Sequence, residues 1–162
     1  MAFSITGAIA GLNYGWLTAI DRFIDNPFIF GVIIILLGLV FIKERKARIR
    51  FFAALLLTFF VATTLKTTLG VQMPCAIAGV DTCPTDYSLP STHSAVAFTL
   101  MFALLDKKSF PIFLIFALFV AFSRINFGVH TFEDVCAGLP LAFISVFLVE
   151  RVCERWKLCL GN

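Results

Sequence analysis

The chain has 162 residues and a formal net charge of +3; 60% of it is hydrophobic and only 14% is charged. A soluble domain of this length could not cover so much apolar surface, so we expect one membrane-embedded domain over residues 1–162. The positive charge does not indicate a nucleic-acid partner, because ten of the 13 Lys and Arg residues lie in short segments between apolar runs. These segments, 43–50, 106–108 and 150–157, hold five, two and three of them.

The first predicted element is an amphipathic helix over residues 1–26. Its apolar positions recur at spacings of three and four, at Ile5, Ile9, Leu12, Trp16, Ile20 and Phe23. We expect this helix to lie on the outer membrane interface. The alternative is a sixth, half-inserted membrane segment. No charged n-region or cleavage signal precedes Pro27, so a removable signal peptide is not expected.

Five apolar runs follow, at 27–42, 51–65, 95–105, 110–122 and 135–149. Each is shorter than the ~20 residues that a helix needs to span the hydrocarbon core. The last four approach that length only if the polar residues at one end are included. We therefore expect an all-α bundle of five transmembrane helices whose polar ends lie at headgroup depth. Prolines at 27 and 111 suit helix starts, whereas Pro140 should kink the last span.

The three basic segments predict which side of the membrane each loop faces. Under the positive-inside rule they are cytoplasmic, which indicates a multi-pass protein of the cell membrane. Arg22, Lys66 and Arg124 then lie on the extracytoplasmic side, where the charge bias disfavours them. The long outward loop 70–89 also contains Cys75 and Cys83, which either form a disulfide or remain two free thiols.

The segment PSTH at residues 90–93 has the features of an anion site. Pro90 restricts the residue before it and Ser91 is a preferred N-cap, so a helix should begin at His93. Unpaired backbone N–H groups and the helix dipole at such a start attract anions such as phosphate. The alternative is a capped helix whose histidine is merely interfacial.

The segment SRINFGVHTFEDV, residues 123–135, gathers ionisable side chains between two apolar runs. Arg124 offers a planar fork of donors that suits a phosphate, and Gly128 allows a close backbone turn. If a helix starts at His130, Asp134 shares its face, and the carboxylate can accept from Nδ1–H and leave Nε2 as a nucleophile. The alternative is a structural histidine capped by its own helix.

Together these segments resemble the three-part signature of the type 2 phosphatidic acid phosphatase superfamily. The resemblance covers residues 60–149 in order and spacing. The matching residues are Lys66, Pro74, Pro90, Ser91, His93, Ser123, Arg124, His130 and Asp134.

The resemblance implies a metal-independent phosphoric ester or diphosphate hydrolase with no cofactor and no required protein partner. His130 would attack phosphorus to give a phosphohistidine, oriented by Asp134, while His93 would protonate the departing alcohol and later activate water. The phosphoryl oxygens would be held by Lys66, Ser91, the backbone at Thr92 and Arg124. The expected substrate is a lipid phosphate monoester or isoprenyl (di)phosphate, hydrolysed on the extracytoplasmic side.

The sequence departs from the family pattern at Thr92, where Gly is commonest, and at Met73, which replaces an arginine. Three explanations of Met73 are open: weaker phosphate affinity, replacement by Arg22 from the interfacial helix, or a lipid or packing contact. Met73 also motivates the main alternative function, a catalytically weak lipid-phosphate-binding protein of the same fold. A transporter is disfavoured because the midplanes of the spans carry no charge. A haloperoxidase is disfavoured because those relatives are soluble.

Overall fold

The computed structural model describes residues 5–10, 15–81 and 83–156, which contain helices and no strand. The predicted all-α class is therefore confirmed for the described part of the chain. In chain order the helices are α1 (Ile5–Ala10), α2 (Gly15–Asp25), α3 (Pro27–Phe41), α4 (Arg45–Leu69), α5 (Pro74–Ile77), α6 (Thr92–Ala103), α7 (Phe110–Asn126) and α8 (Phe132–Trp156).

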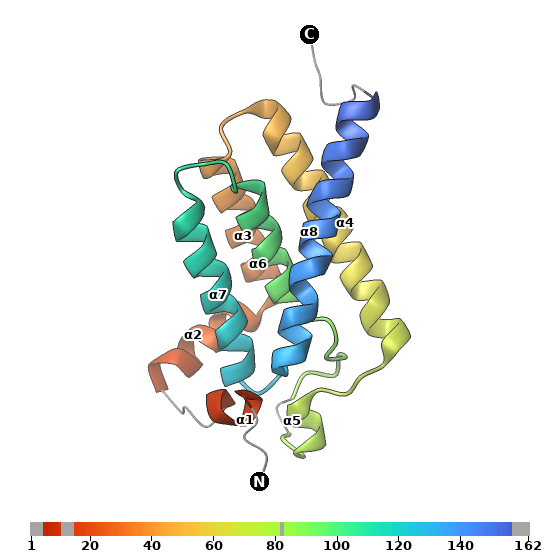
Figure 1. Ribbon diagram of the computed structural model, residues 1–162. Helices are drawn as coiled ribbons and strands as arrows, with labels where there is room; N and C mark the ends of the chain where they lie inside the picture. The colour runs from red at the N-terminus through yellow and green to blue at the C-terminus, as the bar shows by residue number, and fades with distance from the viewer. Residues whose placement is uncertain (1–4, 11–14, 82, 157–162) are drawn as a thin grey trace.

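Five helices, α3, α4, α6, α7 and α8, form the bundle, and α6 lies at its centre (Figure 1). Helix α6 contacts the other four, and every residue from Ser94 to Met101 is buried. A helix at the centre of a bundle is covered by its neighbours on all sides, whereas outer helices can expose apolar side chains to lipid. The hydrophobic core consequently surrounds α6, and the N-terminus of α6 opens at one end of the bundle.

The helix ends follow local sequence signals. The Asn26 side chain accepts hydrogen bonds from the N–H groups of Phe28 and Ile29, and Pro27 occupies the first turn of α3, as predicted. Helix α4 ends at Gly70, whose φ of 61° is the left-handed conformation that favours glycine. Helix α8 remains helical through Pro140, and the kink expected there stays a prediction.

The molecule is a membrane protein with large apolar side chains on the outside of the bundle. Leu56, Phe60 and Ile115 are 69–70% exposed, which suits hydrocarbon rather than water. By length and composition two described segments can cross a membrane, Arg45–Ile77 and Phe132–Arg155, and a third if the bent α2–α3 pair counts as one span. Helices α6 and α7 are apolar but shorter, so the count of five transmembrane helices remains a prediction.

The N-terminal segment differs from the single helix expected over 1–26. The described residues there form two helices, α1 and α2, while residues 1–4 and 11–14 lie outside the described part of the chain. Helix α2 meets α3 at 85°, and both α1 and α2 lie against α7 at one end of the bundle (Figure 1). Both the interfacial position of this segment and the alternative of a half-inserted sixth segment stay predictions.

The three basic segments, as far as they are described, lie together at the other end. The α3–α4 connection, the α6–α7 connection and the C-terminal end of α8 meet there, opposite α1, α2 and α5 (Figure 1). The bundle therefore has a basic end and an end that carries the motif residues.

Candidate active site

Four helix ends bring the predicted site residues to one end of the bundle (Figure 1). Lys66 lies in the last turn of α4, Arg124 in the last turn of α7, and Ser91 directly before α6. His130 lies in the turn before α8, and Asp134 in its first turn. All five are at least 90% buried.

His130 and Asp134 meet through a third residue that sequence reasoning missed. The His130 Nδ1 atom lies 3.7 Å from Asp134 Oδ2, which is too long for a direct hydrogen bond. The Ser88 hydroxyl donates to Asp134 Oδ2 and lies 3.4 Å from His130 Nδ1. Ser88 therefore links the carboxylate to the imidazole. Its position in a polar loop did not distinguish it in the sequence from other loop serines and threonines.

The backbone fixes where the His130 ring can lie. Helix α8 starts at Phe132, so His130 lies two residues before the helix rather than in its first turn. Gly128 adopts a φ of 77°, and the reversed chain lets the His130 N–H donate to the Arg124 carbonyl at 3.3 Å. The Asp134 carboxylate accepts from the Thr131 N–H at 2.7 Å, which anchors it at the N-terminus of α8.

The electrostatic surroundings keep the His130 ring neutral. Burial is the main cause that lowers the pKa of His130, and the nearby Arg124 and Lys66 charges act in the same direction. Asp134 opposes this effect but does not outweigh it. A neutral imidazole with Nδ1 directed towards Ser88 and Asp134 has its Nε2 lone pair available as a nucleophile.

The second motif lies against the third. The Ser91 N–H donates to the Asp134 carbonyl at 3.0 Å. One turn further along each helix, Gly138 approaches α6 so closely that a Cβ there would lie 3.0 Å from the Ala95 nitrogen. Ser91 occupies the N-cap position of α6 as predicted, but its hydroxyl pairs with Ser94 Oγ at 3.0 Å rather than capping a backbone N–H. The first N–H groups of α6 consequently keep their affinity for an anion.

His93, in the first turn of α6, presents an unpaired nitrogen. Its Nε2 atom is buried without a hydrogen-bond partner among the described residues. The ring packs on Phe30 of α3 at a centroid distance of 4.8 Å and lies within electrostatic range of Arg124, His130 and Lys66. A buried, unpaired ring nitrogen within electrostatic range of three motif residues suits proton transfer to a ligand.

Lys66 is held by the loop that follows α5. Its Nζ atom donates to Asp86 Oδ2 and to the Tyr87 carbonyl, both at 2.6 Å, and its side chain is only 6% exposed. Burial alone would raise the pKa of Asp86. Hydrogen bonds from Lys66 and the Tyr87 backbone, together with the nearby positive charges, outweigh burial and lower this pKa. Asp86 is thus a carboxylate that fixes a buried ammonium group. The sequence did not predict this pair, because Asp86 lies in a loop with several other polar residues.

Arg124, the second buried cation, is held by a carboxylate of helix α2. Its Nη2 atom lies 2.5 Å from Asp25 Oδ1 of α2, and its guanidinium lies 5.8 Å from the centroid of the Phe127 ring. The Nε and Nη1 atoms are buried without hydrogen-bond partners in the described ranges. Because unpaired buried donors are costly, these two nitrogens mark a place for an acceptor such as a phosphoryl oxygen.

Met73 belongs to a small apolar cluster beside the site. It is 4% exposed and packs with Cys75 and Val129. The disulfide that the sequence left open is formed between Cys75 and Cys83, with a Cα–Cα distance of 5.6 Å. Arg22 is exposed on α2. The packing explanation of Met73 therefore agrees with the structure, and replacement by Arg22 does not.

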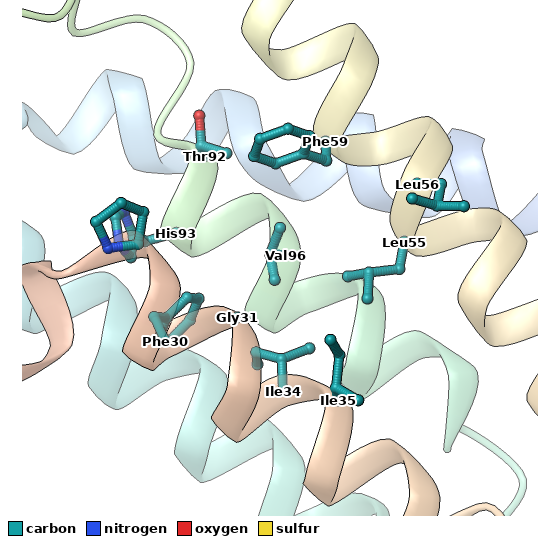
Figure 2. A pocket seen from close by; sticks show the side chains of 11 residues that line it. Phe30, Gly31, Ile34, Ile35, Leu55, Leu56, Phe59, Thr92, His93 and Val96 are labelled. Atoms are coloured by element: carbon teal, nitrogen blue, oxygen red, sulfur yellow. The ribbon is translucent and has the colours of Figure 1, made fainter.

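An apolar groove leads from the site to the outside of the bundle (Figure 2). It has a volume of about 180 Å³ and runs between α3, α4 and α6. His93 and Thr92 lie at one end, and Leu56 and Phe59, which are 70% and 54% exposed, lie along its open side. The groove thus connects the His93 ring with the hydrocarbon region expected around the bundle.

The described residues contain no group of three or more His, Cys, Asp or Glu side chains placed to hold a metal ion. What the site offers is a neutral imidazole, a second histidine, two buried cations and a helix N-terminus. Such a set can bind a phosphoryl group, attack it and protonate a leaving oxygen.

Comparison with solved structures shows the fold. LpxE from Aquifex aeolicus superposes with a TM-score of 0.73 and 22% identity over 93% of this chain and 96% of that chain. The first transmembrane PAP2 type phosphatidylglycerolphosphate phosphatase from Bacillus subtilis gives 0.67 and 22%, over 93% of this chain and 83% of that chain.

Sequence comparison relates about half of the chain to longer proteins. Sphingosine-1-phosphate phosphatase 2 from Homo sapiens is 33% identical over 89 residues, or 48% of this chain, and the Mus musculus protein is 30% identical over 83 residues, or 45% of this chain. The matched regions cover only 22% and 23% of those relatives. The profile of the PAP2 superfamily matches residues 47–157, which span every motif residue discussed above. The chain therefore belongs to the PAP2 superfamily, as its three motif segments predicted.

Proposed function

We propose that this protein is a membrane phosphatase that hydrolyses a lipid phosphate through a phosphohistidine intermediate. The observation that carries the proposal is the placement of His130, buried against Ser88 and Asp134, at the end of the bundle that also holds His93 and two buried cations. Relatives and structural neighbours whose names describe phosphatases of lipid phosphates support the same reaction class.

The mechanism divides the reaction into two steps. The His130 Nε2 lone pair attacks phosphorus as the bond to the lipid oxygen breaks, and protonated His93 gives its proton to that oxygen. His93 then takes a proton from water, whose oxygen attacks the phosphohistidine, breaks the P–N bond and releases phosphate. Arg124, Lys66 and the N–H groups at the start of α6 stabilise the charge that develops on the phosphoryl oxygens, with Ser91 and Thr92 forming that helix start.

The apolar groove supports a substrate with a hydrocarbon chain. The leaving oxygen must lie next to His93, and the groove starts at His93 and opens at the side of the bundle. A lipid can therefore keep its chain in the groove while its phosphate lies against Arg124. Substrates that fit this chemistry include phosphatidate, phosphatidylglycerophosphate, sphingoid phosphates and polyprenyl mono- or diphosphates.

The charge distribution supports an active site on the extracytoplasmic side of a multi-pass cell-membrane protein. The basic segments lie at the end opposite the site, where the positive-inside rule assigns the cytoplasm. In this proposal five helices cross the bilayer, α1 and α2 lie on its outer surface, and residues 60–149 form the core of a single domain. Cysteines introduced in 43–50 should then resist an impermeant thiol reagent in intact cells, while ones near Asp81 react. The opposite labelling pattern would overturn the orientation.

Phosphate release in detergent tests the reaction. The purified protein is incubated with a panel of lipid phosphates, with His130→Ala as the matched inactive form. We expect release by the wild type, none by His130→Ala, and inhibition by vanadate, which imitates the trigonal phosphoryl centre. Release by His130→Ala at the wild-type rate would contradict the nucleophile assignment. No release by either form, with retained lipid binding, would instead favour a catalytically weak lipid-phosphate-binding protein, which the missing family arginine at Met73 suggests.

A substitution in the groove tests the substrate class separately. A Cβ at Gly31 would meet no atom within 4 Å, so Gly31→Phe can fill the groove without disturbing the helix packing. We expect hydrolysis of long-chain lipid phosphates to fall about tenfold or more while hydrolysis of short, soluble phosphate esters is retained. Val32→Phe, on the exposed side of the same helix, is the control and should change neither rate.

A further inference from the structure

Asp25 contacts the candidate site although it belongs to none of the three motif segments. It is the last residue of α2, and its Oδ1 atom lies 2.5 Å from Arg124 Nη2 across 99 residues of sequence. The Arg124 side chain is 2% exposed and that of Asp25 is 30% exposed. The ion pair thus joins the outer, N-terminal helix to a buried cation of the phosphate site.

The fold holds Asp25 in this place by two further contacts. Asp21, one turn earlier, is completely buried and accepts a hydrogen bond from Asn126 Nδ2 at 3.3 Å. Ile24 is buried in the main hydrophobic core between them. Asp21 and Asp25 lie one helical turn apart, and both contact α7. The position of the Asp25 carboxylate is therefore fixed by the packing of α2 rather than by the choice of side-chain rotamer.

The geometry of the ion pair leaves most of the arginine available. Asp25 engages only Nη2, whereas Nε and Nη1 are buried without hydrogen-bond partners in the described residues. A carboxylate that occupied the place of the phosphate would be expected to take two guanidinium nitrogens at once, as carboxylates and phosphates commonly do. Asp25 therefore positions the guanidinium without filling its anion site. The unpaired Nε and Nη1 atoms indicate that a second anionic ligand binds there.

Arg124 also contacts the candidate nucleophile through its backbone. The Arg124 carbonyl accepts the His130 N–H at 3.3 Å, so its backbone supports His130 while its side chain is held by Asp25. Asp25 therefore holds the side chain of the same residue whose backbone carbonyl supports His130.

We propose that Asp25 is a positioning residue that holds the Arg124 guanidinium ready to bind the phosphoryl group of the substrate. This inference rests on the proposed function, because it takes Arg124 as a phosphate ligand. It adds the interfacial helix α2 to the machinery of a reaction otherwise assigned to residues after Lys66.

Vanadate affinity measures this role directly. Asp25→Ala should weaken vanadate binding and lower kcat/KM for a lipid phosphate, each by about tenfold, because a charge-assisted contact that orients the arginine is lost. Asp25→Glu should recover most of both values. Arg22→Ala, an exposed position on the same helix, should leave both unchanged. Thermal unfolding of each variant in detergent shows whether the fold is retained.

A double-mutant cycle separates positioning from general stability. In an Arg124→Ala background, the additional change Asp25→Ala should cost nothing further, because Asp25 acts through the arginine. An equal loss in both backgrounds would overturn the proposal. So would unchanged vanadate affinity in Asp25→Ala, and so would tighter binding, which would make Asp25 a competitor of phosphate. Calorimetric vanadate binding needs no turnover, so the proposal can be judged even if the wild type hydrolyses no tested lipid.

Discussion

The two ends of the bundle use ion pairs in different ways. At the basic end Lys107 pairs with Glu44 at 2.8 Å, with side chains 43% and 66% exposed, and Arg151 pairs with Glu154 at 3.7 Å on the surface of α8. At the site end Lys66 and Arg124 are almost fully buried, and each is held by one carboxylate from outside the motifs, Asp86 or Asp25.

The difference in burial gives the two sets of ion pairs different energetic roles. Exposed pairs are screened by water and contribute little to stability, so the ion pairs of the basic end do little to hold the fold together. Buried cations carry a desolvation cost that a single carboxylate does not fully offset. In the proposed function a bound phosphate offsets the rest of this cost, and among the described residues two Arg124 nitrogens have no hydrogen-bond partner. Five substitutions or profiles test this contrast, beginning with the largest expected effect.

Loss of His93 should have the largest effect among them. His93→Ala should lower hydrolysis of a lipid alkyl phosphate by about 100-fold to 10,000-fold, because the departing alkoxide then receives no proton. With p-nitrophenyl phosphate the loss should be much smaller, because nitrophenolate leaves without protonation. Steady-state rates on both substrates measure the difference. Equal losses would remove His93 from the role of general acid.

Met73→Arg should destabilise the protein rather than improve the site. Met73 is packed with Cys75 and Val129, so a guanidinium there would be buried without a partner, at a cost of about 3 kcal/mol or more. Met73→Leu keeps the volume and should cost less than about 1.5 kcal/mol. Unfolding in detergent measures both. Wild-type stability combined with tighter vanadate inhibition in Met73→Arg would show instead that position 73 faces the phosphate.

Ser88→Ala tests the link between Asp134 and His130. Removal of a hydrogen bond to a charged group corresponds to about 1.5 to 3 kcal/mol, so turnover should fall by about tenfold to 100-fold while lipid binding is retained. Measurement of kcat and KM separates the two quantities. A change in KM alone would assign Ser88 to substrate binding.

The pH profile tests the state of His130. Burial lowers the pKa of this imidazole, and only the neutral ring can attack phosphorus. As pH falls, the acid limb of kcat/KM should therefore appear below the ordinary histidine pKa of about 6.5. Asp134→Asn should move that limb to still lower pH in any residual activity, because Asp134 raises the pKa of His130. A limb that moves to higher pH would contradict this arrangement.

The basic end should give the smallest effect. Lys107→Ala removes an exposed pair with Glu44 and should leave phosphate release within about twofold of wild type. A large loss of activity would show that the two ends are coupled, and the contrast between them would not hold.

The sequence alone determined the chemistry-bearing segments and the helical class. Composition required a membrane solvent, Pro27 and Pro111 marked the starts of α3 and α7, and the spacing around His93 and His130 identified the family. These features can be predicted because helix ends, apolar runs and motif segments are each determined by residues that are close together in sequence.

Only the tertiary structure decided which partners complete the site. Asp25, Asp86 and Ser88 lie 99, 20 and 46 residues from the side chains they hold, and no local pattern marks them as partners. The same holds for Met73, whose place in an apolar cluster follows from the packing of α5 against the turn before α8. A carboxylate in a polar loop and one that fixes a buried cation look alike in sequence. They differ only in which helix ends the fold brings beside them.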